Sequence, residues 1–145
     1  MEIIMMKYLA LFMLFTTQLF AYLPTPPVIG SLCTESDRDF REHRYDEYIA
    51  VCERNVSTPR KDQICKRDGV SNRRNYTVDH VIPLFMGGSN YDDNLWCQHN
   101  SIYTGNIEQK IYFKLNRGDI TQQEAIREIK KIKFKTVQTF TATLF

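Results

Sequence analysis

The chain has 145 residues, with 19 lysines and arginines against 17 aspartates and glutamates, and so a formal net charge of +2. This length supports one domain, because two hydrophobic cores need a longer chain. The composition, 43% hydrophobic and 25% charged, excludes a disordered or fibrous protein. The small net charge excludes binding to nucleic acid through overall positive charge, but it leaves room for an enzyme with local basic patches.

The N-terminal segment has the pattern of a secretory signal peptide. Lys7 precedes a short apolar run, and the small residue Ala21 follows at a position suited to cleavage. A membrane anchor or a buried helix is the alternative, but the run is well short of the roughly 20 residues that cross a bilayer. We expect removal of residues 1–21 and a secreted or periplasmic protein without stable membrane association. The prolines that follow predict an extended linker over residues 22–32, and residues 33–145 form the single domain.

Four cysteines lie in the domain: Cys33, Cys52, Cys65 and Cys97. An even number of cysteines in a small exported domain predicts two disulfides. Three pairings are possible, and the sequence does not choose among them. A zinc site is the alternative, but the cysteine spacings do not resemble those of a zinc finger.

Local signals predict an α+β domain in which four helices accompany two short strands. The expected elements are helices over 36–53, 58–65 and about 106–117, a helix from residue 121 onward, strands over 76–78 and 94–97, and a loop over 83–93. Ser36 and Asp37 are the predicted cap of the first helix. Thr121 and Glu124 form a capping box at the start of the last helix. Trp96 is expected in the core.

The residues at the end of the first strand have the chemistry of a hydrolytic site. Asp79 offers a hard carboxylate ligand suited to Mg²⁺, and a neutral His80 can act as a general base near pH 7. Cleavage of a phosphodiester needs a deprotonated water and a cation near the leaving oxygen. Asn94, at the returning strand, carries an amide that can hold the intervening loop and the histidine strand in place.

Three short motifs follow one another in this region: Val78–Leu84, Gly87–Asn90 and Asn94–Trp96. In this order they resemble the HNH, or His-Me finger, endonucleases of the small secreted type, over about residues 76–118. The resemblance implies a ββα-metal core, in which two strands, a loop and a helix surround one divalent ion. That ion would be Mg²⁺, with Mn²⁺ or another divalent ion as the alternative.

The resemblance also implies roles for individual residues. His80 would be the general base, Asp79 a metal ligand and Asn94 the structural asparagine. The family's second metal ligand lies on the following helix, where this chain departs from the usual pattern. We choose Asn106 for this position, and the alternatives are His99, Asn100 and Glu108.

Basic segments over residues 60–74 and 127–135 flank the motif and could contact phosphates on either side of the site. Arg73 and Arg74 are the expected phosphate contacts, or else solvated loop residues. The C-terminal lysines are expected on the exposed face of the last helix or on DNA; they are Lys130, Lys131, Lys133 and Lys135. These features predict a monomeric, metal-dependent endonuclease that hydrolyses DNA with little sequence preference, and RNA is a further possible substrate. A non-catalytic nucleic-acid-binding module and an effector that acts on a host protein are the alternatives.

Overall fold

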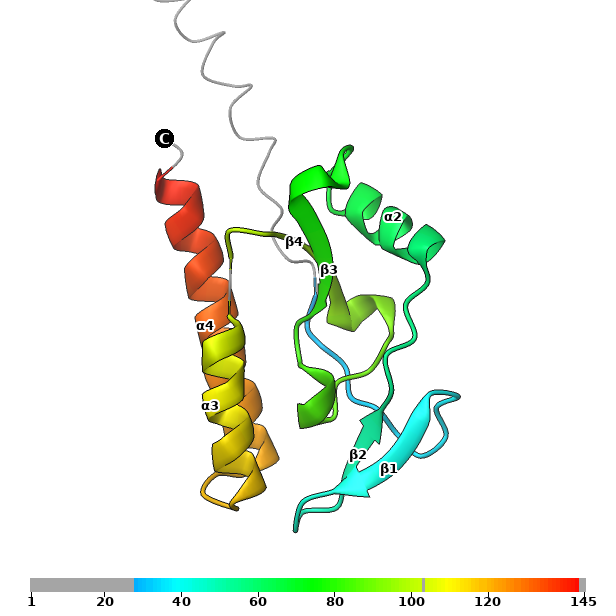
Figure 1. Ribbon diagram of the computed structural model, residues 1–145, viewed down its shortest axis with the longest axis vertical. Coiled ribbons are helices and arrows are strands. Elements are labelled where there is room, and N and C mark those ends of the chain that lie inside the picture. Colours follow the sequence, from blue (N-terminus) through cyan, green and yellow to red (C-terminus); the bar gives the residue numbers. More distant parts are fainter. Residues whose placement is uncertain (1–27, 103, 144–145) are drawn as a thin grey trace, which may run out of the picture.

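The computed structural model describes residues 28–102 and 104–143, and for residues 135–143 only the course of the helix is described. The predicted signal peptide, residues 1–21, and residues 22–27 of the predicted linker lie outside the described residues. The described chain is α+β, as the sequence predicts. It contains two separate antiparallel hairpins, one short helix and a pair of longer helices (Figure 1).

The first hairpin lies where the sequence predicts a helix. Strand β1 (Phe40–Arg44) pairs antiparallel with β2 (Ile49–Cys52), so the predicted helix over residues 36–53 is wrong. Tyr45 and Tyr48, in the turn between the strands, have positive φ angles of 63° and 56°. An α-helix contains no such backbone conformation.

Two local features explain why this segment forms strands. Asp37, the predicted helix cap, accepts a hydrogen bond from the backbone N–H of Thr34 (2.7 Å) and so closes a turn. Ile49 and Val51 are β-branched, and both are buried in the main hydrophobic core. β-branched side chains pack well on a half-buried strand. Burial of Ile49 and Val51 in this core therefore stabilises a strand here more than a solvated helix would be stabilised.

The second hairpin and the helix beside it confirm three predicted elements. Helix α2 (Thr58–Arg67) precedes β3 (Tyr76–His80), which pairs antiparallel with β4 (Leu95–His99). Figure 1 shows α2 against one side of this hairpin, and contacts join α2 to both strands. Trp96 is 3% exposed in a small core cluster, as predicted.

The predicted loop over residues 83–93 lies between β3 and β4, and its helical parts are short 3₁₀ turns. Gly87 has a φ of +84°, which favours glycine. At Gly88 an added Cβ would lie 1.8 Å from the carbonyl oxygen of Ile82. Both glycines are therefore needed for the loop to fold back over the end of β3.

Two helices complete the chain, as predicted. Helices α3 (Gly105–Asn116) and α4 (Gln122–Thr143) pack side by side on the opposite side of the β3–β4 hairpin from α2 (Figure 1). The predicted capping box is present, because Glu124 Oε2 accepts from Thr121 N–H (2.8 Å) and Glu124 N–H donates back to Thr121 Oγ1 (3.3 Å). The main core lies between these helices and the first hairpin. Within the described residues, no helix has the length and apolar character needed to cross a membrane.

The last part of the predicted linker lies against the domain. Val28 is 5% exposed, and the backbone N–H of Gly30 donates to the carbonyl of Asp93 (2.9 Å). Leu32 forms an isolated antiparallel bridge with Gly88. The segment that precedes the first cysteine therefore helps to hold the loop between β3 and β4.

Two disulfides are formed, as predicted, and the structure selects one of the three possible pairings: Cys33–Cys52 and Cys65–Cys97. The first ties the N-terminal segment to β2, and the second ties α2 to β4. Two disulfides are consistent with a secreted protein. They add stability to a domain whose hydrophobic core is small.

Removal of the Cys65–Cys97 disulfide is expected to lower the free energy of unfolding by about 3 to 4 kcal/mol, because the bond closes a loop across 32 residues. The Cys65→Ala/Cys97→Ala double variant tests this by urea unfolding. The Cys33→Ala/Cys52→Ala variant opens a loop of 19 residues and should lose slightly less. An unchanged urea midpoint in the first variant would contradict the expectation.

Candidate active site

A pocket of about 400 Å³ opens beside the C-terminal end of β3. Asp79 and His80 reach it from the end of that strand, and Glu108 reaches it from α3. Three arginines also line it: Arg41 and Arg44 from β1, and Arg54 from the segment after β2. Glu53, which follows β2, also lines the pocket, so the two hairpins and α3 bring together a histidine, three acidic residues and three arginines from distant parts of the sequence.

The hydrogen bonds of Asn90 assign the tautomer of His80. Asn90 Nδ2 donates to Asp39 Oδ2 (3.0 Å) and to the carbonyl of Glu53 (2.8 Å), which leaves Asn90 Oδ1 as an acceptor. His80 Nε2 lies 3.0 Å from this oxygen and must carry the hydrogen. His80 Nδ1 therefore keeps its lone pair, as a general base requires.

The environment of His80 favours its neutral form. The side chain is 2% exposed, and burial is the main cause that lowers its pKa below the usual 6.5. The hydrogen bond to Asn90 raises the pKa, and the positive charge of Arg54 lowers it further. Arg54 Nη2 lies 3.5 Å from His80 Nδ1, so the unprotonated nitrogen is on the side of the pocket arginine. Near pH 7 this imidazole is therefore neutral and can accept a proton directly.

Replacement of Arg54 by glutamine is expected to raise the pKa of His80, because a nearby positive charge that disfavours the imidazolium is removed. The midpoint should remain below 6.5, since burial is the larger cause. An NMR titration of the His80 ring measures this without any activity assay. Arg74→Gln changes an exposed arginine outside the pocket and should leave the midpoint unchanged. An unchanged or lower pKa in Arg54→Gln would contradict the assignment.

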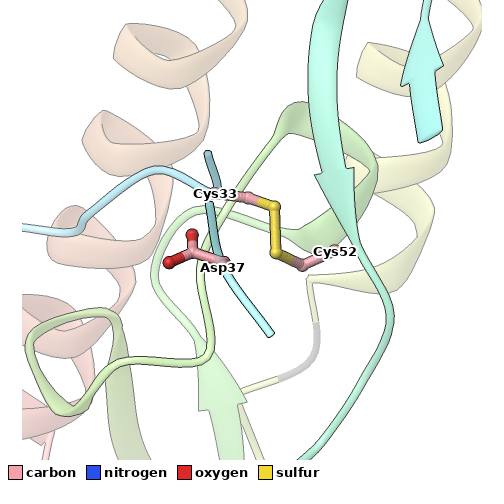
Figure 2. Close-up of side chains that lie close together, drawn as sticks. All are labelled: Cys33, Asp37 and Cys52. Atoms are coloured by element: carbon pink, nitrogen blue, oxygen red, sulfur yellow. A yellow bond between two sulfur atoms is a disulfide. The ribbon is translucent and has the colours of Figure 1, made fainter. Parts of the chain in front are cut away.

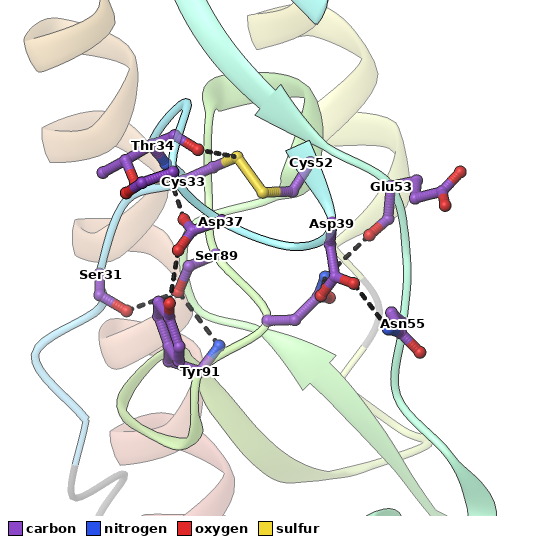
Figure 3. The surroundings of a disulfide bond; sticks show 12 residues. Ser31, Cys33, Thr34, Asp37, Asp39, Cys52, Glu53, Asn55, Ser89 and Tyr91 are labelled. Carbon is purple, nitrogen blue, oxygen red and sulfur yellow. Dashed lines mark hydrogen bonds between the residues drawn. A yellow bond between two sulfur atoms is a disulfide. The ribbon is translucent and has the colours of Figure 1, made fainter. Parts of the chain in front are cut away.

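The first hairpin fixes the orientation of the histidine through a hydrogen-bonded network. Asp39 accepts from Asn90 and also from Asn55 Nδ2 (2.6 Å). Figure 3 shows Asp39 and Asn55 near the Cys33–Cys52 disulfide. The disulfide holds β2 next to the N-terminal segment. His80 thus depends for its orientation on residues well upstream of its own motif.

Asn94 has the contacts that its predicted structural role requires. It is fully buried, and its Oδ1 accepts from the backbone N–H of Ile82 (2.8 Å). Its Nδ2 donates to the carbonyls of Ile82 (3.0 Å) and Ser89 (2.8 Å). One side chain therefore satisfies three backbone groups of the loop that follows His80.

Lys133 occupies an unexpected position, because it lies in the site although the sequence predicts it on an exposed helix face or on DNA. It is 1% exposed, so that prediction is wrong. Its Nζ contacts Asp79 Oδ2 (2.7 Å), Glu108 Oε1 (2.9 Å) and the carbonyl oxygen of His80 (2.6 Å). The correction follows from packing, since α4 passes close to the end of β3 and turns this lysine inward.

The same three oxygens are the ones that could hold the divalent ion predicted from the HNH resemblance. Two carboxylates and a carbonyl are a hard donor set that suits Mg²⁺. They converge on the ammonium group of Lys133, however, so a divalent ion could bind there only if Lys133 left. With Lys133 in this position the residues present do not fit a metal ion.

Asn106, the predicted second metal ligand, lies at the start of α3. It is exposed and outside the pocket. Glu108, two residues farther along α3 and one of the alternatives, is the residue that shares an ion partner with Asp79. Two residues are about half a turn of helix, so Asn106 and Glu108 lie on nearly opposite faces of α3 and only Glu108 faces the strand.

A different group of potential ligands comprises Cys33, Asp37 and Cys52 (Figure 2). Within the described part of the chain it is the one set of three or more His, Cys, Asp or Glu whose ligand atoms all lie within 4.8 Å of one another. Both sulfurs are joined in a disulfide, so neither is a thiolate that could bind metal. This group therefore serves the fold.

Arg73 and Arg74, the predicted phosphate contacts, precede β3 and lie at the opposite end of that strand from His80. Arg73 pairs with Asp62 (2.8 Å), and Arg74 is exposed. The sequence did not indicate the position of the three pocket arginines, because a helix over residues 36–53 would not direct them toward the motif. The β-branched pair in β2 was the signal that could have indicated a hairpin there.

Comparison of the chain with protein-family models, with curated proteins and with solved structures found no match. The site is therefore interpreted from its own chemistry. It holds a neutral histidine whose unprotonated Nδ1 faces Arg54, a pocket lined with arginines, and two carboxylates bridged by a buried lysine.

Proposed function

We propose that the protein is a secreted phosphodiester hydrolase, an endonuclease that cuts DNA, with His80 as the general base. The observation that carries the proposal is the neutral His80, whose Nδ1 faces a pocket lined by three arginines. The HNH-like motif around His80 supports the same reaction. Guanidinium groups bind phosphate oxygens in a bidentate manner, and a histidine with a lowered pKa suits proton abstraction near neutral pH.

In this mechanism the scissile phosphate lies among the pocket arginines, with the attacking water against His80 Nδ1. The water oxygen forms a bond to phosphorus, its proton passes to Nδ1, and the bond from phosphorus to the leaving ester oxygen breaks. The leaving alkoxide takes a proton from solvent water, and Nδ1 afterwards returns its proton to solvent. The arginines balance the negative charge that builds up on the phosphoryl oxygens. Asn90 keeps the ring in place through His80 Nε2–H. Bound phosphate would also offset the charge of Arg54, which makes the imidazolium less costly to form.

A divalent ion in such a site would supply Lewis-acid stabilisation of the leaving oxygen. We assign no step to it, because Lys133 holds the place between Asp79 and Glu108. Lys133 does not line the pocket, so the arginines are the cationic side chains that a bound substrate would contact. We propose little sequence preference, since the described pocket offers groups suited to phosphates.

A nucleic-acid-binding module without turnover is the second candidate. The observation that favours it is the lysine in place of the metal ion, since loss of the ion removes much of the catalytic power of such a site. The arginine pocket would serve equally well to hold a phosphate.

Incubation of the secreted chain with supercoiled plasmid, labelled single-stranded DNA and labelled RNA tests the proposal. We expect nicking of the plasmid and cutting of the DNA strand at neutral pH. Cleavage of RNA alone would correct the substrate class. A mobility shift without any cleavage would overturn the hydrolase and support the binding module.

The pocket arginines are expected to carry the affinity for nucleic acid. Arg41→Ala/Arg54→Ala should weaken DNA binding and reduce the slope of log K against log salt by about 2, because each phosphate contact contributes roughly 0.9. Arg44 is left unchanged because Glu42 already accepts from its Nε (2.6 Å). Fluorescence anisotropy across a salt series measures both quantities. Arg73→Ala/Arg74→Ala is the matched control, and a larger effect in that variant would place the binding surface at the other end of β3.

A further inference from the structure

Lys133 has the contacts of a bound cation. Its ammonium group is buried, and its three hydrogens can all be used, since three oxygens lie within hydrogen-bond distance. Two of these oxygens belong to the carboxylates of Asp79 and Glu108, and the third is the carbonyl oxygen of His80. A buried lysine is rare unless it is paired in this way.

The position of this ammonium coincides with the place where a metal ion would serve the site. Asp79 directly precedes the general base on β3, and Glu108 comes from the first turn of α3. Their oxygens, with the His80 carbonyl, form what we call the oxygen cage: Asp79 Oδ2, Glu108 Oε1 and His80 O. Oxygens of this kind bind hard cations, and the cage holds a single positive charge supplied by α4.

We propose that Lys133 is an internal cation that takes the place of a divalent metal ion in the oxygen cage. The ammonium balances one of the two carboxylate charges and links β3, α3 and α4. Its hydrogens are all directed at cage oxygens, so it offers no open position to water or phosphate. The proposal concerns the cage alone and does not depend on whether the protein cuts nucleic acid.

Removal of the ammonium should turn the cage into a metal site. Without Lys133, two partly buried carboxylates face the space that the ammonium occupied, and like charges so placed favour an added cation. The freed volume also admits water molecules, which a bound Mg²⁺ or Mn²⁺ retains. In the natural chain, by contrast, the tethered ammonium competes with any ion at a very high effective concentration.

Titration with Mn²⁺, followed by electron paramagnetic resonance and by calorimetry, tests the proposal on the full secreted chain. Lys133→Met should bind one Mn²⁺ at least about tenfold more tightly than the natural chain does. Lys133→Met/Asp79→Asn should lose that binding. Lys131→Met is the matched control, because Lys131 is exposed on the same helix and should resemble the natural chain.

Two outcomes would overturn the proposal. One is Mn²⁺ binding by the natural chain that equals that of Lys133→Met and is lost in Asp79→Asn, because Lys133 would then yield its place. The other is a folded Lys133→Met that binds no Mn²⁺, because the cage would then not be a cation site. Lys133→Gln, which keeps a hydrogen-bond donor of similar length, replaces Lys133→Met if the methionine variant does not fold. A rise in the melting temperature of the natural chain with added Mn²⁺ that is absent in Asp79→Asn would also overturn the proposal, and this comparison needs no lysine variant.

Discussion

Replacement of His80 by alanine is expected to lower the rate of phosphodiester cleavage by about 10²- to 10⁴-fold, because the variant lacks the general base. The unprotonated Nδ1 that faces Arg54 and the lowered pKa both belong to this one ring. The measurement is the initial rate of cutting of a fluorophore-labelled DNA strand at pH 7. DNA affinity should change little, since the arginines remain.

His43→Ala is the control for this variant, because His43 lies on β1 outside the pocket and pairs with Glu35. It should cut at the rate of the natural chain. Equal rates for His80→Ala and the natural chain would show that the general base lies elsewhere and would remove the central residue of the proposed mechanism.

Replacement of Asn94 by alanine is expected to lower the free energy of unfolding by about 3 kcal/mol or more. The variant leaves three buried backbone groups without a partner: the N–H and carbonyl of Ile82 and the carbonyl of Ser89. Each such loss costs about 1 to 3 kcal/mol. For a domain of this size the melting temperature should fall by about 10 °C or more, as measured by thermal unfolding followed by circular dichroism.

Asn106→Ala is the control for Asn94→Ala, because it removes the same side chain from an exposed position at the start of α3. Its melting temperature should stay close to that of the natural chain. A melting temperature for Asn94→Ala within 2 to 3 °C of the natural chain, about the effect of half a kilocalorie per mole, would show that water or a rearranged loop satisfies the three backbone groups.

Both results concern residues of the three neighbouring motifs over residues 78–96, and this explains why they could be predicted from the sequence. Asp79 and His80 are adjacent, and the return of the chain into β4 brings Asn94, 12 residues after Ile82, back to the loop. Local propensities also placed α2, β3, β4, α3 and the capping box of α4 correctly. Each of these signals depends on neighbours within about a dozen residues. The elements they predict therefore form in any tertiary fold that keeps the hairpin.

The first hairpin shows where local signals fail. Ser36 and Asp37 have the composition of a helix cap, yet Asp37 closes a turn. The preference of Ile49 and Val51 for a strand became decisive only because α3, α4 and the loop after β3 supply a core for them. Propensity is weaker than such packing, and the three pocket arginines were missed together with the hairpin.

The sequence by itself determined the α+β class, the Asp79–His80 pair, the role of Asn94 and the presence of four cysteines able to form two disulfides. The tertiary structure decided the disulfide pairing, the arginines that share the pocket with His80, and the choice of Glu108 over Asn106 beside Asp79. It also placed Lys133, 54 residues from Asp79 in the chain, between the two carboxylates. The physical reason is distance along the sequence. A strand, its return and its loop are organised by local geometry, whereas a charge brought in by a remote helix depends on how the whole core packs.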